Sequence, residues 1–567
     1  MTGKNNISGM MIAVLAVAAG VGVTLFARWE PGGETWGYWF FARVFAETGK
    51  FPIVERGPLY CLYLNLFRLM HYPASLITEY VVTSFMTAAA FIFFFRRYIG
   101  LFGSVLAFLL WLPFLQFAEP PVQKLALAFS FFALMSRGDG TSKFRLSLSY
   151  AFLGLAYLVR GTYLIFILVF GVWDCIRAFR QGKFRGLADF LRPSIVCWPL
   201  IMVLALFMWF KSAETSHPWN NIWFTSTNWY PADGKKQGDS TFIHNYNWQY
   251  IFYKYGSFKD KDFYFTNKEL FNGAKDIAGA VRANPGFVAE QMTRNIRAAF
   301  YSVADYTLFY KIFFGYFIPT VLFALAVLYG AFCAARGRKD IVVFIIANVL
   351  VLGTAVVALP KGRYFVPLIP ILVLSAYWYG DRAREILSSR RFSASVAFFA
   401  IPLALVIFSN GVGGWKTMIK NIAGDIKARD VRIMESRPYS VKASFKTLEP
   451  LFSDCKGAMS LEATFYGAFT GIPLDRNYDV WEIPPFGKLG DAEYKGLTPE
   501  RVDCVIVSHE LATGMGAGIN FQLRYDNYIK PYIKELQDKG AKVYDIKDFG
   551  EVFALSSGKS TGEAGKK

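Results

Sequence analysis

The chain has 567 residues, of which 54% are apolar and 18% aromatic, and its mean hydropathy is +0.30. Soluble domains hold about 45–50% apolar residues, so this composition favours a polytopic membrane protein with one soluble part. A net charge of +19 would suit a nucleic-acid-binding protein, but the basic residues lie between apolar runs, which argues against that class. Six scattered cysteines and four histidines argue against a zinc site.

The first apolar run extends from Gly9 to Ala27, after Lys4. About 20 residues are enough to cross the ~30 Å core of a bilayer, so the run predicts a membrane-spanning helix. Its small residues Ala16, Ala18 and Ala19 would also permit a cleaved signal peptide. The length of the run and the number of apolar segments that follow favour an uncleaved anchor.

The stretch from Glu30 to Tyr60 reads EPGGETWGYWFFARVFAETGKFPIVERGPLY. It places Glu30 and Glu34 in a Gly-rich turn, continues with a short aromatic helix at 36–47, and ends with Arg56 before a Gly-Pro-Leu-Tyr step. Ionisable groups so close to a membrane surface default to a functional role. We predict that this loop, within 28–78, holds the active site.

Ten further apolar runs predict membrane-spanning helices. They are Glu79–Phe95, Leu101–Phe117, Pro121–Met135, Leu146–Val159, Thr162–Cys175, Ser194–Phe210, Ile312–Cys333, Ile341–Leu359, Tyr364–Tyr379 and Ser393–Ser409. With the first run they make eleven candidates. The apolar stretch 58–72 is too short to span comfortably, and we expect it to lie near the interface.

Basic residues follow every even-numbered run, and such residues gather on cytoplasmic loops. They are Arg96 and Arg97, then Arg137, Lys143 and Arg145, then Arg177, Arg180, Lys183 and Arg185, then Arg336, Arg338 and Lys339, and finally Arg382, Arg384, Arg390 and Arg391. The pattern predicts a cytoplasmic N-terminus and places the opening loop, residues 211–311 and the tail after 410 outside. No soluble domain then remains in the cytoplasm, where nucleotide-sugars are found.

The outer loop at 211–311 is polar but rich in aromatic residues. In its second half apolar residues recur at helical spacing, and Asn284-Pro285-Gly286 divides them into two amphipathic helices. Such helices would serve as a lid or acceptor platform, or would pack against the membrane face. The pattern fits both roles.

Beyond residue 410 the composition is that of a soluble protein. Val502–Ser508 predicts a buried strand, Tyr528–Lys539 a helix, and Lys542–Ile546 and Val552–Leu555 two more strands. We therefore expect an extracytoplasmic α/β domain at 425–557 and a disordered tail at 558–567. Cys455 and Cys504 both lie in this region and would face an oxidising compartment, where they either pair or remain buried thiols.

Glu34 is the candidate catalytic residue. A carboxylate at the mouth of a helical bundle can act as a general base on an acceptor hydroxyl or amine. Glu34 also precedes the aromatic helix and could serve as its N-cap, although Asp or Ser would cap better.

Arg56, Lys361 and Arg363 are basic residues on the predicted outer side, against the positive-inside pattern. The planar fork of arginine suits a phosphate group, whereas snorkelling toward lipid headgroups is the alternative. Glu119 and Arg160 flank apolar runs on the same side, and they form either a functional site or a structural ion pair.

Several motifs together resemble the GT-C glycosyltransferases, and most closely their protein O-mannosyltransferase and lipid A aminoarabinose transferase branch. They are an acid eight residues before Ala42-Arg43, the segment AETGKFP, the Arg-Gly-Pro-Leu-Tyr step, a Glu-Pro at the fourth run and RYFVPLIP late in the bundle. The resemblance covers residues 9–410 and implies a transmembrane glycosyltransferase domain at 1–410.

The resemblance assigns roles to single residues. Glu34 takes the place of the family's catalytic acid, which is usually Asp. Arg56 takes the place of a basic residue that contacts the donor phosphate, and Arg363 matches a late Arg before Tyr, with Lys361 beside it. Two departures are Glu34-Thr35 in place of Asp-Glu and Gly57-Pro58 in place of Pro-Pro.

The implied reaction moves a sugar from a polyprenyl-phosphate donor to an extracytoplasmic acceptor, which would be lipid A, another envelope glycan or a protein. We expect an inverting displacement at the cell inner membrane, without a cofactor or metal because cations hold the phosphate. The expected supporting residues are Glu30, Tyr38, Tyr60, Glu119 and Arg160. Glu30 and Glu34 as ligands of a divalent ion are the alternative.

A transporter or flippase for an envelope glycolipid is the rival function. Transporters often contain internal repeats and broken helices at the midplane, and the sequence shows no repeat. The ionisable residues here also lie at the outer ends of the runs. A structural or assembly protein would have no need of both Glu34 and Arg56.

Overall fold

The computed structural model describes residues 2–27, 33–48, 58–70, 74–117, 122–137, 142–182, 228–232, 235–239, 246, 268–274, 277–305, 317–358, 366–389, 415, 455–460, 477–479, 500, 502–508, 525–546 and 550–555. The chain divides into two compact units. The helical unit comprises residues 1–32, 50–224 and 288–424, and the mixed unit comprises 33–49, 225–287 and 425–567. Each unit is described by itself.

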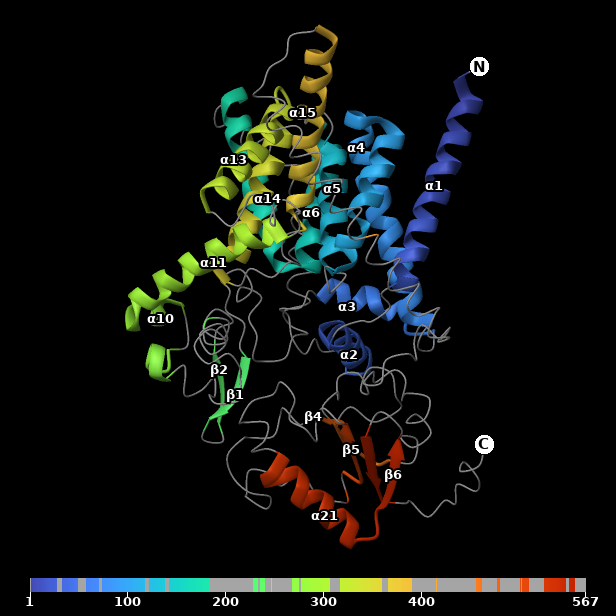
Figure 1. Ribbon diagram of the computed structural model, residues 1–567, viewed down its shortest axis with the longest axis vertical. Helices are drawn as coiled ribbons and strands as arrows, with labels where there is room; N and C mark the ends of the chain where they lie inside the picture. Colours follow the sequence, from blue (N-terminus) through green and yellow to red (C-terminus); the bar gives the residue numbers. More distant parts are fainter. Residues whose placement is uncertain are drawn as a thin grey trace. The chain divides into compact units, whose positions relative to one another are not determined.

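The helical unit is a bundle of long apolar helices (Figure 1). Its elements are α1 (Thr2–Ala27), α3 (Pro58–Asn65), α4 (Ala74–Phe117), α5 (Val122–Arg137), α6 (Lys143–Val159), the 3₁₀ turn η2 (Gly161–Tyr163) that opens the helix Gly161–Gly182, α13 (Phe317–Ala334), α14 (Lys339–Ala358) and α15 (Leu368–Ser389). Helix α11 (Pro285–Asp305) begins in the mixed unit and continues in the helical one.

Three helices within the described residues are long and apolar enough to cross a membrane, namely Ser8–Leu25, Ala74–Leu112 and Gly161–Gly182. Large apolar side chains are exposed along these helices, among them Leu15, Phe102 and Val172. Soluble monomers rarely leave so much contiguous apolar surface uncovered. The exposed faces therefore fit contact with lipid, as the apolar runs predicted.

Two of the eleven predicted runs, 194–210 and 393–409, lie outside the described residues, and the other nine fall wholly or partly on helices. The runs Glu79–Phe95 and Leu101–Phe117 form the two arms of α4, which turns at Gly100 with φ 69° and ψ 178°. Only glycine adopts that backbone conformation readily, so Gly100 lets one span lead directly into the next.

The core of the bundle is aromatic. Phe94 of α4 and Phe131 of α5 have ring centroids 5.1 Å apart, and Phe131 lies 5.7 Å from Phe344 of α14. Phe166 reaches the same Phe344 ring at 5.7 Å. Helix α5 is buried on nearly all sides, so it occupies the centre of this packing.

Small residues let the outer helices approach closely. A Cβ placed on Gly20 of α1 would lie 2.5 Å from Leu109 of α4, and one on Gly330 of α13 would lie 2.7 Å from the Tyr379 ring of α15. Close backbone approach at small residues is the usual way in which membrane helices associate. Each site therefore fixes one helix against its neighbour.

A buried ion pair joins helices at the end of α5. Arg137 is 1% exposed and donates to Asp174, which is 4% exposed and also accepts a hydrogen bond from Tyr150 at 2.7 Å. Arg137 Nε lies 3.6 Å from Asp340 of α14, and the guanidinium lies over the Phe170 ring at 4.6 Å. The prediction of Arg137 as a basic loop residue is thus wrong: two carboxylates hold it inside the bundle.

The mixed unit contains α2 (Gly33–Thr48), the hairpin β1 (Asn228–Ala232) and β2 (Lys235–Asp239), α10 (Ile277–Ala283), and a five-stranded sheet with its helix. The sheet consists of β3 (Ala458–Ser460), β4 (Asn477–Asp479), β5 (Cys504–Ser508), β6 (Lys542–Ile546) and β7 (Gly550–Ala554), in the order β4-β3-β5-β7-β6. Strand β3 pairs in parallel with β4 and β5, whereas β7 pairs antiparallel with β5 and β6.

One face of the sheet packs on a helix that begins with a π-helical turn, η9 (Tyr525–Ile529), and continues as α21 (Lys530–Asp538). Tyr528, Tyr532 and Leu536 of this helix form a buried core with Val505 and Phe553 of the sheet. The predicted helix and the predicted strands after 502 are confirmed. The three-residue strands β3 and β4 and the β1–β2 hairpin were not predicted from the sequence.

The break at Asn284-Pro285-Gly286 is also confirmed. Helix α10 ends at Ala283 and α11 begins at Pro285. The Asn284 side-chain oxygen accepts a hydrogen bond from the Phe287 N–H at 3.1 Å, which caps the new helix. Proline in the first turn costs the helix no hydrogen bond, because the N–H that proline lacks would have no partner inside the helix.

A disulfide joins Cys455 to Cys504 across 49 residues, which resolves the alternatives that the sequence left open. Beside it the buried carboxylate of Asp503 accepts the N–H groups of Lys456 at 2.8 Å and Gly457 at 3.0 Å. The bridge and these hydrogen bonds fix the segment before β3 against the start of β5.

Replacing Asp174 with alanine should destabilise the helical unit by about 3–5 kcal/mol, because the buried Arg137 loses its closest counter-charge. The measurement is thermal or denaturant unfolding in detergent. Glu385→Ala is the control: it removes the acid of an exposed Arg382–Glu385 pair and should change stability by less than ~1 kcal/mol. Equal effects of the two variants would contradict the role assigned to the buried pair.

Replacing both Cys455 and Cys504 with alanine should destabilise the mixed unit by about 4 kcal/mol, since the bridge closes a loop of some fifty residues in the unfolded chain. Dithiothreitol should lower the unfolding temperature of the unmodified protein and leave that of the double variant unchanged. A response of both proteins to the reductant would show that another bond is responsible.

Candidate functional site

A buried polar cluster lies where α3 meets the first arm of α4 and the start of α5. We call it the Glu79 cluster, and it consists of Tyr60, Tyr63, Glu79, Thr83 and Lys124. Glu79 Oε1 accepts a hydrogen bond from the Tyr60 hydroxyl at 3.2 Å and one from the Thr83 hydroxyl at 2.7 Å. The hydroxyls of Tyr63 and Thr83 lie 2.9 Å apart and share a further hydrogen bond.

The spacing of these residues explains why they meet. Tyr60 and Tyr63 are three residues apart on α3, so their side chains share one face, and their rings stack with centroids 6.0 Å apart. Glu79 and Thr83 are four residues apart on α4 and likewise share a face. Two helices that present these faces to each other bring four polar groups together.

A carboxyl group and an amino group are buried at this point. Glu79 is 2% exposed and Lys124, in the first turn of α5, is 3% exposed. The two side chains interact electrostatically, and the Lys124 ammonium lies 4.8 Å from the centre of the Tyr80 ring. Tyr80 in turn shares a hydrogen bond with Thr24 of α1 at 2.8 Å. Four helices, α1, α3, α4 and α5, are therefore linked through polar contacts.

The hydroxyl groups of the cluster act as hydrogen-bonding groups and not as bases. Burial raises the pKa of Tyr63 to about 12, the negative charge of Glu79 adds to the rise, and the hydrogen bond with Thr83 reduces it. Near neutral pH Tyr63 is then fully protonated. Such a group donates a hydrogen bond to its neighbour and does not act as a base near neutral pH.

Glu34, the predicted base, belongs to α2 of the mixed unit. The helix begins at Gly33, so Glu34 lies within its first turn and not ahead of it, as an N-cap would. An acid in the first turn interacts favourably with the helix dipole. Its side chain lies outside the described part of the structure.

The rest of α2 is the aromatic helix that the sequence predicted. Tyr38 and Trp39 are buried, and Ala42 is buried one turn further on. Arg43 Nε donates to Glu47 Oε1 at 2.6 Å, an intrahelical pair that is only partly buried. Tyr38 therefore contributes to packing in the mixed unit.

The other predicted site residues divide into two groups. Tyr60 lies in the Glu79 cluster, and half-buried Arg160 ends α6, where its N–H donates to the Ala156 carbonyl at 2.9 Å. Five residues lie outside the described ones, namely Glu30, Arg56, Glu119, Lys361 and Arg363. The convergence of Glu34 with the basic groups stays a prediction.

Glu79 and Lys124 were missed by the sequence analysis. Glu79 served only as the first residue of a predicted run, and Lys124 was counted as part of another. The signal that could have found them is their position: ionisable residues inside apolar segments usually face the interior of a bundle and pair there.

Replacing Glu79 with alanine should cost about 3 kcal/mol of stability, because the hydroxyls of Tyr60 and Thr83 lose their acceptor and Lys124 loses the facing charge. Glu79→Gln retains an acceptor of the same size and should cost less, and Tyr60→Phe should cost about 1 kcal/mol. Unfolding temperatures in detergent test this order. An alanine variant as stable as the parent would show that the cluster does not support the fold.

No protein-family model matches the chain, and no curated protein matches it. Among solved structures, the chain is similar to the crystal structure of ArnT from Cupriavidus metallidurans bound to undecaprenyl phosphate. The two share 12% sequence identity with a TM-score of 0.44, over 98% of this chain and 99% of the other.

Proposed function

We propose that the protein is a membrane glycosyltransferase that moves a sugar from a polyprenyl-phosphate donor to an extracytoplasmic acceptor. In this proposal Glu34 is the base, and Arg56 and Arg363, with Lys361, hold the donor phosphate. The acceptor would be lipid A, another envelope glycan or a protein. The transferase domain covers residues 1–410, with outer loops 28–78 and 211–311, and an extracytoplasmic α/β domain follows at 425–557.

The chemistry requires one acid and a cationic phosphate site. An acceptor hydroxyl or amine attacks the anomeric carbon while its proton passes to the Glu34 carboxylate. The bond between that carbon and the phosphate oxygen breaks, and polyprenyl phosphate leaves with the electron pair. Two guanidinium groups would stabilise the charge that develops on the leaving oxygen. A single displacement of this kind inverts the anomeric centre.

The observation that supports the proposal most directly is the anchoring of the chain just after Arg56. Pro58 opens α3 with a fixed φ angle, and Tyr60, four residues after Arg56, donates to the buried Glu79. Catalytic groups need supports that are themselves held by packing and hydrogen bonds. The Glu79 cluster supplies such a support at the base of the loop that carries Arg56.

The disulfide supports the proposed topology. Disulfides persist in oxidising compartments and are rare in the cytosol, and Cys455–Cys504 lies in the segment that the charge pattern assigns to the outer side. We therefore infer an inner-membrane protein with a cytoplasmic N-terminus and an extracytoplasmic C-terminal domain. On that side a lipid-linked sugar is the natural activated donor.

Glu34→Gln should abolish sugar transfer and leave the unfolding temperature unchanged, because the amide is nearly isosteric but cannot accept a proton. The assay follows radiolabelled sugar from an undecaprenyl-phosphate donor into envelope glycolipids or protein, with the purified full-length enzyme. Glu47→Gln is the matched control on the same helix and should retain activity. Full transfer by Glu34→Gln would remove the assigned base.

Arg56→Ala should raise the KM for the donor by about tenfold or more, since one charge-assisted contact to phosphate is lost. Arg68→Ala, which removes another arginine from the same outer segment, should leave the KM within about twofold. If every preparation of the purified protein binds the donor but neither transfers nor hydrolyses its sugar, that result would instead favour the transporter or flippase function.

A further inference from the structure

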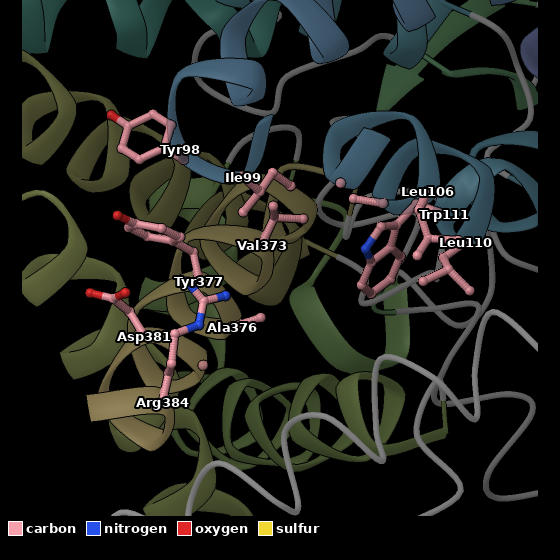
Figure 2. A pocket seen from close by; sticks show the side chains of 13 residues that line it. Tyr98, Ile99, Leu106, Leu110, Trp111, Val373, Ala376, Tyr377, Asp381 and Arg384 are labelled. Atoms are coloured by element: carbon pink, nitrogen blue, oxygen red, sulfur yellow. The ribbon is translucent and has the colours of Figure 1, made fainter. Parts of the chain in front are cut away.

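A groove between α4 and α15 of the helical unit belongs to neither the proposed active site nor the Glu79 cluster (Figure 2). Its volume is about 460 Å³, within the range of about 300–1,000 Å³ that small-molecule sites occupy. It is lined by residues 98–111 of α4, on both sides of the turn at Gly100, and by residues 373–384 of α15.

The groove is polar at one end and apolar at the other. Figure 2 shows Tyr98, Tyr377, Asp381 and Arg384 gathered at one end, and Leu106, Leu110 and Trp111 at the other. Leu106 is 55% exposed, so the apolar end opens on the outer surface of the bundle. A headgroup joined to an acyl chain has the same division between charged and apolar parts.

The polar end lies among arginines. The guanidinium of Arg338 lies 4.8 Å from the centre of the Tyr98 ring, and Arg97 interacts electrostatically with the same tyrosine. With Arg384 these groups outnumber Asp381, so the surroundings of the groove are positive. Basic pockets between membrane helices on the cytoplasmic side are the sites that bind anionic lipid headgroups.

We propose that this groove binds one anionic glycerophospholipid from the leaflet next to the basic loops. Its phosphodiester would lie at Arg384, a headgroup hydroxyl would donate to the Asp381 carboxylate, and an acyl chain would follow Leu106, Leu110 and Trp111. The inference depends on α4 and α15 spanning a membrane and is independent of glycosyl transfer. Snorkelling of Arg384 to the interface is the simpler role from which it must be distinguished.

The experiment uses the purified, delipidated full-length protein in detergent. Phosphatidylglycerol and phosphatidylcholine with the same chains are titrated separately, and binding is followed by native mass spectrometry and by the rise in unfolding temperature. Phosphatidylglycerol should bind at one saturable site and raise the unfolding temperature. Equal binding of phosphatidylcholine would overturn the proposal.

Two arginines on α15 provide a matched pair of variants. Arg384 lines the groove, whereas Arg382 forms an exposed ion pair with Glu385 and lies over the ring of Trp378, both on α15. Arg384→Gln should weaken phosphatidylglycerol binding by about fivefold, and Arg382→Gln by less than about twofold. An equal loss in both variants would show only general attraction to the basic surface and would overturn the site.

The apolar end is tested separately with Ala107→Leu, which adds bulk to the wall of the groove and keeps every charged group. This variant should also lower the affinity for phosphatidylglycerol, without lowering the unfolding temperature of the lipid-free protein. Unchanged binding would show that no acyl chain enters the groove. If Arg384→Gln does not fold, the test uses Ala107→Leu together with Arg384→Lys. Arg384→Lys retains the positive charge and should bind phosphatidylglycerol nearly as well as the parent protein does.

Discussion

A charge that leaves water for an apolar helix bundle must find a partner there, and the helical unit depends on this constraint at both ends of α5. At one end Arg137 is held by Asp174 and Asp340, with Tyr150 on the same aspartate. At the other end Lys124 faces Glu79 and the ring of Tyr80. Because α5 lies at the centre of the bundle, these contacts fix the neighbouring helices in position along their length.

The two ends differ in what they support. The Arg137 network places one guanidinium between two carboxylates at the end of α5, which suits a structural role. The Glu79 cluster reaches through Tyr60 to the start of α3, and so to the segment that carries Arg56. A rigid bundle thus gives the proposed phosphate-binding loop a fixed attachment point, although no group in the cluster needs to react.

The proposed chemistry draws on both units. Glu34 lies in the first turn of α2 in the mixed unit, whereas the residues just after Arg56 belong to the helical unit. The disulfide between Cys455 and Cys504 stabilises the mixed unit independently of any bilayer, which suits a segment exposed to an oxidising compartment.

The sequence by itself determined the elements whose signals are local. Apolar length predicted the helices, Asn284-Pro285-Gly286 predicted the break between α10 and α11, and the short apolar segments after residue 502 predicted β5, β6 and β7. The tertiary structure alone decided which polar residues meet. Arg137 and Asp174 are 37 residues apart and Cys455 and Cys504 are 49 apart, and a basic residue after an apolar run looks the same in a solvated loop or in a buried pair. Periodicity and hydropathy report the environment along one helix, whereas pairing depends on the distance between helices, which only the folded chain fixes.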